Sequence, residues 1–142
     1  MFAIVEEPID VEEVIAAVAH PSAGAIVTFI GTTREHNQGR RVTLLEYQAY
    51  PDMAIAEMTK IGTNARHQWE IAGIAIVHRV GAVPLGEASV VIAVAAAHRK
   101  PAFAACEFAI DRLKEVVPIW KKEHFEGGEV WIGSQTGQPL EL

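Results

Sequence analysis

The chain has 142 residues, 50% of them hydrophobic and 21% charged, a composition that fits one globular domain with a buried core and excludes the disordered and collagen-like classes. Its formal net charge of -6 argues against nonspecific nucleic-acid binding, because a phosphate backbone would meet a repulsive average field. The acidic first residues do not resemble a secretory signal, the longest nearly apolar run (88–97) is about half of a membrane span, and a lone cysteine fits a reducing compartment, so we expect a cytoplasmic protein.

The first third of the chain predicts one helix and two strands. Asp10 followed by Glu13 is a capping box that opens a helix over 11–19. The apolar, β-branched run 24–30 is typical of a strand buried on both faces, and a second strand follows over 42–49. They form a hairpin-like pair with a long, polar, cationic connection, and such connections in small domains tend to be functional.

The middle of the chain predicts a second helix and two more strands. Pro51 stands at the favoured first position of a helix that continues toward Trp69. Strands follow over 73–80 and 87–97, and the glycines and proline between them predict a loop.

The last third predicts a helix and a terminal hairpin. Pro101 opens the helix, Pro118 ends it, and its buried stripe includes Phe103. Residues 119–132 turn at two glycines and return as a strand. The whole order predicts a single α+β domain over 1–142, in which three helices pack on a largely antiparallel sheet.

The basic residues of this acidic chain gather in two segments, which could form one local anion site. His98, Arg99 and Lys100 lie just before the N-terminus of the third predicted helix, where free backbone N–H groups already favour an anion. Positive charge has the wrong electrostatic sign for a helix N-terminus, which favours a functional role such as phosphate binding. The alternative is an ordinary polar loop.

Lys114 and Lys121 flank the end of the same helix. A cation in the last helical turn is favourable to the helix dipole, so a purely structural role explains Lys114 by itself. Pro118 breaks the helix, however, and the chain could turn back and bring Lys121 toward Lys114. Neighbouring ammonium groups, Lys122 included, would lower one another's pKa, whereas a bound phosphate would raise it.

The connection over 31–41 offers further anion ligands. Arg34 can bind phosphate through two N–H groups, and the hydroxyls of Thr32 and Thr33 add donors. Asn37 and Gly39 could simply set a turn. The segment is not a P-loop, because the lysine and hydroxyl residue after the second glycine are missing.

Metal and cysteine chemistry are weakly supported. The histidines lack the spacing of metal-binding motifs, so we expect no metal and no cofactor. Cys106 lies on an apolar helical stripe, as a small buried hydrophobe does, and has no neighbouring base. The histidines interpreted as ordinary core or surface residues are His20, His67 and His78.

Four blocks of sequence carry a family resemblance over 24–131. They read FIGTTREHNQG, LEYQAYPDMA, VHRVGAVPLGEASVVIAVAAAHR and DRLKEVVPIWKKE. This set, in this order and spacing, resembles the large, catalytic subunit of molybdopterin synthase. The most specific pieces are AHR before the last helix and LK with PIWKKE at its end.

The resemblance implies an α/β hammerhead fold and a sulfurtransferase activity. Enzymes of this family convert cyclic pyranopterin monophosphate, called precursor Z, to molybdopterin in molybdenum cofactor biosynthesis by installing two sulfurs as a dithiolene. The sulfur arrives as a thiocarboxylate on the C-terminal glycine of a small ubiquitin-like sulfur-carrier subunit. Two large subunits form the central homodimer of a heterotetramer.

The resemblance also assigns roles residue by residue. Lys114 and Lys121 would be catalytic, assisting proton transfers and stabilising charge. Arg34, His98 and Arg99 would hold the cyclic phosphate. The implied substrate contacts are Thr32, Thr33, Arg34, His98, Arg99, Lys122 and Glu123. Relatives often lack a threonine just before the arginine of the first loop, and often carry a basic residue beyond the tail tryptophan, where this chain has Gln135.

A different class of function stays open from the residues alone. The same cations could serve a noncatalytic, phosphate- or nucleotide-binding regulatory module. That alternative gives no account of Lys121, Lys122 and the Trp120 anchor that follow the last helix.

Overall fold

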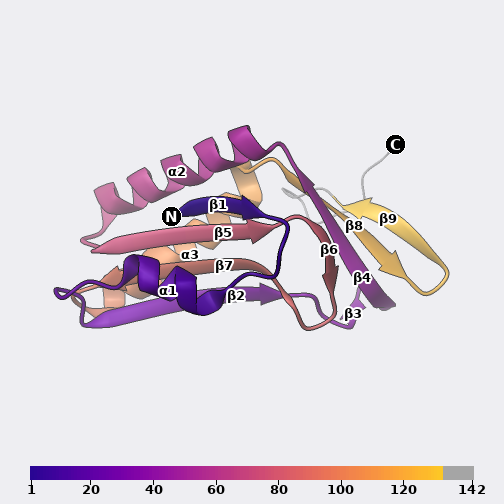
Figure 1. The fold of residues 1–142 in the computed structure, drawn as a ribbon, viewed down its shortest axis with the longest axis horizontal. Helices are drawn as coiled ribbons and strands as arrows, with labels where there is room; N and C mark the ends of the chain where they lie inside the picture. Colours follow the sequence, from indigo (N-terminus) through magenta and orange to yellow (C-terminus); the bar gives the residue numbers. More distant parts are fainter. Residues whose placement is uncertain (133–142) are drawn as a thin grey trace.

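A computed structural model describes residues 1–132 of the chain. Within them three helices alternate with short and medium strands (Figure 1). In chain order the elements are β1 (Phe2–Val5), α1 (Val11–Val18), β2 (Ala25–Thr32), β3 (His36–Asn37), β4 (Arg40–Ala49), α2 (Pro51–Gln68), β5 (Gly73–Arg79), β6 (Gly81–Pro84), β7 (Ala88–Ala96), α3 (Arg99–Val116), β8 (Ile119–Phe125) and β9 (Gly128–Ile132).

The strands form two sheets. The first has the order β1-β5-β7-β2, and only its β1–β5 pair is parallel. The second has the order β3-β4-β8-β9, with β6 also paired to β4. Figure 1 shows the first sheet along the body of the molecule and the second beside its end, so the two sheets meet where β2 and β5 end and the antiparallel β7 begins.

The first sheet separates two hydrophobic clusters, because side chains of a strand alternate between its faces. Ile74 and Ile76 of β5 face α2 and α3 and belong to the larger cluster. Ala75 and Val77 of the same strand face α1 and belong to the smaller one, which includes Val14. Both faces of β5 and β7 are therefore buried, which explains their nearly continuous apolar sequences.

The helices confirm the sequence predictions within two residues. Asp10 caps α1 by accepting a hydrogen bond from the backbone N–H of Glu13 at 3.2 Å, and α2 has its proline at the first position. The terminal hairpin is confirmed as β8 and β9. In α2, Gly62 allows the ring of Phe2 to approach so closely that a β-carbon there would collide with it.

The predicted pairing of the first two long strands is wrong. β2 pairs with β7, while β4 pairs with β8 and β6 in the other sheet. β2 is also an edge strand with one face half-buried and the other exposed, so it is not buried on both faces. A short apolar run looks the same in both situations, because burial depends on what the rest of the chain lays against it.

Three smaller features also differ from the prediction. No strand was predicted at β1, which pairs with β5. The segment of β6 was predicted to be a loop, but β6 pairs with β4. Phe103 was predicted in the buried stripe of α3, but it is 60% exposed, and the buried positions around it are Ala102, Ala105 and Cys106. The apolar residues of α3 cover more of its circumference than the packed face does, and Phe103 lies just outside that face.

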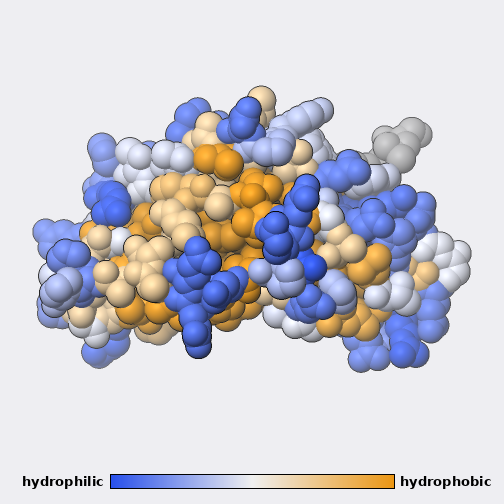
Figure 2. Space-filling model, in the orientation of Figure 1, coloured by the Kyte–Doolittle hydropathy of each residue, from blue (hydrophilic) through white to orange (hydrophobic). Residues whose placement is uncertain are grey.

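The surface carries apolar residues over the strands and charged residues around the rim. Figure 2 shows hydrophobic residues gathered across the middle of this face, and hydrophilic residues on α2 and around the end where β8 and β9 lie. No helix within residues 1–132 is long and apolar enough to cross a membrane.

Candidate active site

A cavity of about 620 Å³ lies where the two sheets meet, a size suited to a small molecule. The end of β2, the middle of β4 and the last turns of α3 form its walls, together with one face of β8. Its lining residues that carry polar or ionisable groups are Thr32, Arg34, Asn37, Tyr47, His78, Ser89, Lys114, Lys121 and Glu123.

The two lysines flanking the end of α3 both line this cavity. Leu113 and Lys114 follow Ile110 by three and four positions, so both neighbour it on the side of α3 that lines the cavity. After Pro118 the chain enters β8, and alternate residues Ile119, Lys121 and Glu123 face the cavity. The turn at the proline thus does bring Lys121 toward Lys114, as the sequence suggested.

The surroundings of Lys121 make its ammonium group easier to deprotonate. Burial lowers the pKa of Lys121, and the nearby positive charges of Lys114 and Arg34 lower it further, while Glu123 acts in the opposite direction. Lys114 is exposed and Lys121 is half-buried. A protein with net charge -6 therefore concentrates three cations at one cavity.

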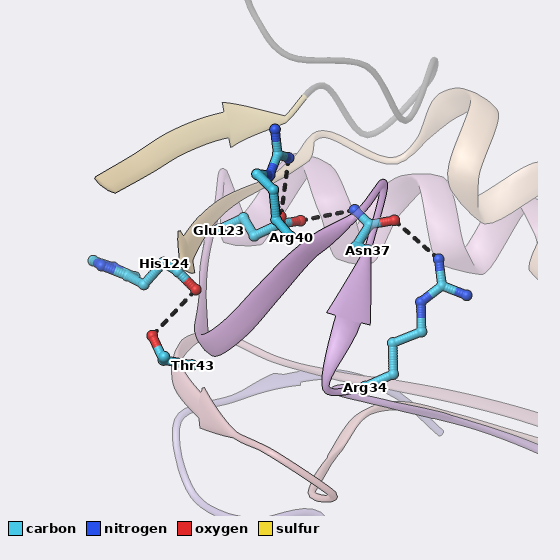
Figure 3. A network of polar contacts seen from close by, with 6 residues as sticks. All are labelled: Arg34, Asn37, Arg40, Thr43, Glu123 and His124. Carbon is cyan, nitrogen blue, oxygen red and sulfur yellow. Dashed lines mark hydrogen bonds and ion pairs between the residues drawn. The ribbon is translucent and has the colours of Figure 1, made fainter. Parts of the chain in front are cut away.

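A hydrogen-bonded network holds the loop that carries Arg34 (Figure 3). Gln38 and Gly39 have positive φ angles of 51° and 76°, as in the tight two-residue turn that joins β3 to β4. This turn pairs Asn37 with Arg40, and both side chains reach the carboxylate of Glu123.

Glu123 is the anchor of this network. It is 1% exposed, accepts from Asn37 Nδ2 at 2.8 Å through Oε2, and forms an ion pair through Oε1 with Arg40 Nη2 at 3.0 Å. Asn37 Oδ1 in turn accepts from Arg34 Nη2 at 3.0 Å. The ring of Phe125 packs under the Arg40 guanidinium at 4.7 Å. Asn37, which could have been a simple turn residue, thus also orients Arg34 toward the cavity.

Four of the residues predicted at the site lie elsewhere in the described chain. Thr33 is 2% exposed, and its hydroxyl donates to the Val83 carbonyl at 3.3 Å, which ties the loop to β6. Lys122 lies on the opposite face of β8, where Nζ is 2.9 Å from a Glu129 oxygen and 5.5 Å from the centre of the Trp131 ring. The hydrogen bond to Glu129 raises the pKa of Lys122.

His98 and Arg99 are the other two, and they lie at the far end of α3. His98 is the residue before the helix and Arg99 its first residue, and both are exposed. Lys114 follows Arg99 by fifteen positions, which in an α-helix is a distance of roughly 22 Å. Within one chain, His98 and Arg99 cannot hold the same small molecule as the Lys114–Lys121 pair. Gln135 lies outside the described residues.

Three cavity residues escaped the sequence reading. Tyr47 faces the cavity from β4, Ser89 from β7, and His78 from β5. The sequence did carry a signal for His78, because His78 and Arg79 end an otherwise apolar strand. A lone histidine in a strand is usually structural, however, so His78 was not predicted at the site. Among the residues described, no group of three or more His, Cys, Asp or Glu side chains could hold a metal ion.

A family model described as MoaE protein matches residues 4–116, which include the end of β2, Arg34 and Lys114. The chain belongs to the MoaE protein family. It is 50% identical to the molybdopterin synthase catalytic subunit of Halalkalibacterium halodurans over 134 residues, covering 94% of this chain and 86% of that protein. It is 46% identical to the human molybdopterin synthase catalytic subunit over 129 residues, covering 91% and 69%.

Solved structures agree with the fold. The crystal structure of molybdopterin synthase from Staphylococcus aureus superposes with a TM-score of 0.89 at 42% identity, covering 93% of this chain and 96% of that one. A complex of subunits 1 and 2 of molybdopterin-converting factor from Helicobacter pylori has a TM-score of 0.75 at 21% identity, covering 92% and 88%, and shares the fold. The predicted α+β class is therefore confirmed.

Proposed function

We propose that this chain is the catalytic subunit of a molybdopterin synthase, a sulfurtransferase that converts precursor Z to molybdopterin. The observation that carries the proposal is the convergence of Arg34, Lys114 and Lys121 on one cavity in an acidic protein of this family. A cyclic monophosphate needs such cations, and a cavity of about 620 Å³ accommodates a pterin.

The site residues divide into two roles. Arg34, held by Asn37, binds the phosphate through its planar guanidinium. Lys121, whose pKa is lowered mainly by burial, transfers protons as sulfur adds to the side chain of the pterin. Lys114, exposed at the rim, stabilises the negative charge that develops there.

The sulfur comes from a partner and not from this chain. Cys106 is 4% exposed within the α3 core, and burial raises the pKa of its thiol to about 11, so little reactive thiolate forms. The donor is the thiocarboxylated C-terminus of a small ubiquitin-like sulfur-carrier subunit, whose tail enters the cavity. The thiocarboxylate, which is anionic, is attracted by the same cations.

Two copies of this chain form the centre of the assembly, and we place their contact at β2. β2 is the free edge of its sheet and exposes Ile26 and Ile30 by 43% and 42%. Its first residue pairs with Ala96, near His98 and Arg99, and its last residues line the cavity. Antiparallel pairing of two β2 strands across a two-fold axis would therefore set His98 and Arg99 of one copy beside the cavity of the other.

The lengths involved support this arrangement. β2 has eight residues and spans roughly 27 Å, close to the roughly 22 Å between Arg99 and Lys114 along α3. Each cavity would then receive one further cation, Arg99, and the His98 imidazole as phosphate ligands from the neighbouring copy.

Mixing two inactive variants tests this shared site. In a mixed dimer of Arg99→Ala and Lys121→Ala chains, one cavity keeps both residues and the other loses both. We expect the mixture to regain about a quarter of wild-type activity, because half of the dimers are mixed and each has one intact site. If mixing after subunit exchange restores no activity while each variant alone is inactive, the site does not cross the dimer.

Reconstitution tests the function itself. The purified chain is supplied with thiocarboxylated carrier subunit and precursor Z, and molybdopterin is detected by mass spectrometry. We expect product only with both additions. A chain that binds a nucleotide without the carrier and incorporates no sulfur would instead be the regulatory module.

We also infer that the enzyme works in the cytoplasm. The lone cysteine and its reduced thiol suit a reducing compartment. Cell fractionation should recover the chain with cytoplasmic markers, and recovery in a membrane or exported fraction would contradict this location.

A further inference from the structure

The cavity has a neutral side as well as a cationic one. His78 lines it from β5, a strand whose residues are all buried, and His78 itself is 4% exposed. Its ring meets that of Tyr47 edge to face, with centroids 4.9 Å apart and planes at 67°. The imidazole is thus held in one orientation against the cavity.

The contacts of His78 determine which nitrogen carries hydrogen. Nδ1 lies 2.7 Å from the backbone carbonyl of Arg79, and a carbonyl oxygen can only accept, so Nδ1–H is the donor. Burial lowers the pKa of His78 to about 4, so the ring is neutral near pH 7. In the neutral ring the other nitrogen, Nε2, is therefore a hydrogen-bond acceptor.

No hydrogen bond to Nε2 forms within residues 1–132. Nε2 is not fully enclosed, since Arg79 Nε is the only fully buried polar side-chain atom without a partner in residues 1–132, and His78 lines the cavity. A ligand that displaces water from Nε2 must therefore supply a hydrogen-bond donor or lose free energy. The other polar groups that surround the cavity on the cationic side are donors, namely Arg34, Lys114 and Lys121. The cavity therefore presents donors on one side and a fixed acceptor on the other.

We propose that His78 Nε2 accepts a hydrogen bond from a ring N–H or amino group of the substrate heterocycle and so sets the orientation of the pterin in the cavity. This inference rests on the proposed function. The phosphate is held by the cations and the nitrogen-rich edge of the ring by His78. A ligand that offers only a phosphate would leave Nε2 unpaired, so His78 makes the site selective for a heterocycle with N–H donors.

Two substitutions separate this role from a structural one. The side-chain amide of asparagine can take the place of Nδ1 and keep the bond to Arg79, but it does not reach the position of Nε2. The longer glutamine side chain can place its amide oxygen near Nε2 and lose the Nδ1 bond. A substrate contact therefore predicts that His78→Asn is the more impaired enzyme, whereas a structural role predicts the reverse.

The measurement is KM and kcat for precursor Z with thiocarboxylated carrier subunit. We expect His78→Asn to raise KM by roughly 10- to 100-fold with a smaller change in kcat, and His78→Gln to stay within a few-fold of wild type. The Kd of inorganic phosphate should be unchanged in both variants. Wild-type KM in His78→Asn, or a greater loss in His78→Gln, would overturn the proposal.

A ligand series on the wild-type chain decides the matter even if a variant does not fold. Pterin monophosphates methylated at successive ring nitrogens and at the amino group remove one donor at a time. We expect one of them to bind at least 10-fold more weakly than its parent, and equal binding of all would refute the role of His78. Failure of wild-type enzyme to convert precursor Z would refute the proposed function instead.

Discussion

Replacing Lys121 with alanine should lower the rate of molybdopterin formation by roughly 100-fold or more while leaving the chain folded. Lys121 faces the cavity from β8, and burial together with the charges of Lys114 and Arg34 lowers its pKa, which suits a proton-transfer group. Single-turnover formation of product, with thiocarboxylated carrier in excess, measures the chemical step directly. Lys114→Ala should cause a loss of similar size, since Lys114 lines the same cavity.

Lys122 provides the sharpest comparison, because it is the next residue of the same strand. Its ammonium group contacts Glu129 and the Trp131 ring on the opposite face of β8. We expect a much smaller loss for Lys122→Ala, and none for Lys60→Ala, whose side chain pairs with Glu57 on α2. Equal losses in the Lys121 and Lys122 variants would show that the face of the strand does not decide the role.

Glu123→Ala should destabilise the chain by about 2–3 kcal/mol and also reduce activity. The change removes a carboxylate that is 1% exposed and leaves Asn37 and Arg40 without their acceptor. The β3–β4 turn then loses its anchor, and Arg34 loses the fixed position of Asn37. Urea unfolding followed by circular dichroism gives the change in the free energy of unfolding.

Matched variants identify what Glu123 does. Glu126→Ala removes an exposed ion pair with Arg41 at 3.6 Å and should cost less than about 1 kcal/mol. Arg40→Ala should reproduce the loss of stability and activity if Glu123 acts as an anchor. Loss of activity in Glu123→Ala with unchanged stability, and an active Arg40→Ala, would mean that the carboxylate acts on the substrate, as the family resemblance implies.

Local structure could be predicted well because its causes are local. The capping residue Asp10, the proline at the start of α2 and Pro118 after α3 act within a few residues of themselves, and all three helices lie where those signals put them. The approach of Lys121 to Lys114 could be predicted for the same reason, because only the turn at Pro118 separates the end of α3 from β8. The wide separation of Arg99 from Lys114 was also implicit, because most of the predicted helix from Pro101 lies between them and the rise per residue of a helix is fixed.

Strand pairing could not be predicted in the same way. The chain neighbours β2 and β4 lie in different sheets, because the residues that pair with them, in β7 and β8, are dozens of positions away. Which face of β8 meets a cavity depends on the same long-range pairing. His78 was missed for this reason, since nothing near it in sequence indicates that Tyr47 and the cavity lie beside it.

The sequence by itself determined the family, the helices, and the concentration of basic residues that points to an anion site. Only the tertiary structure decided which of those residues share a cavity: Arg34, Lys114 and Lys121 meet there, Lys122 points to the other face of its strand, and His98 and Arg99 lie at the opposite end of α3. The physical reason is that residue type and helical spacing are local properties, whereas the direction of a side chain toward a cavity follows from contacts between segments far apart in the chain.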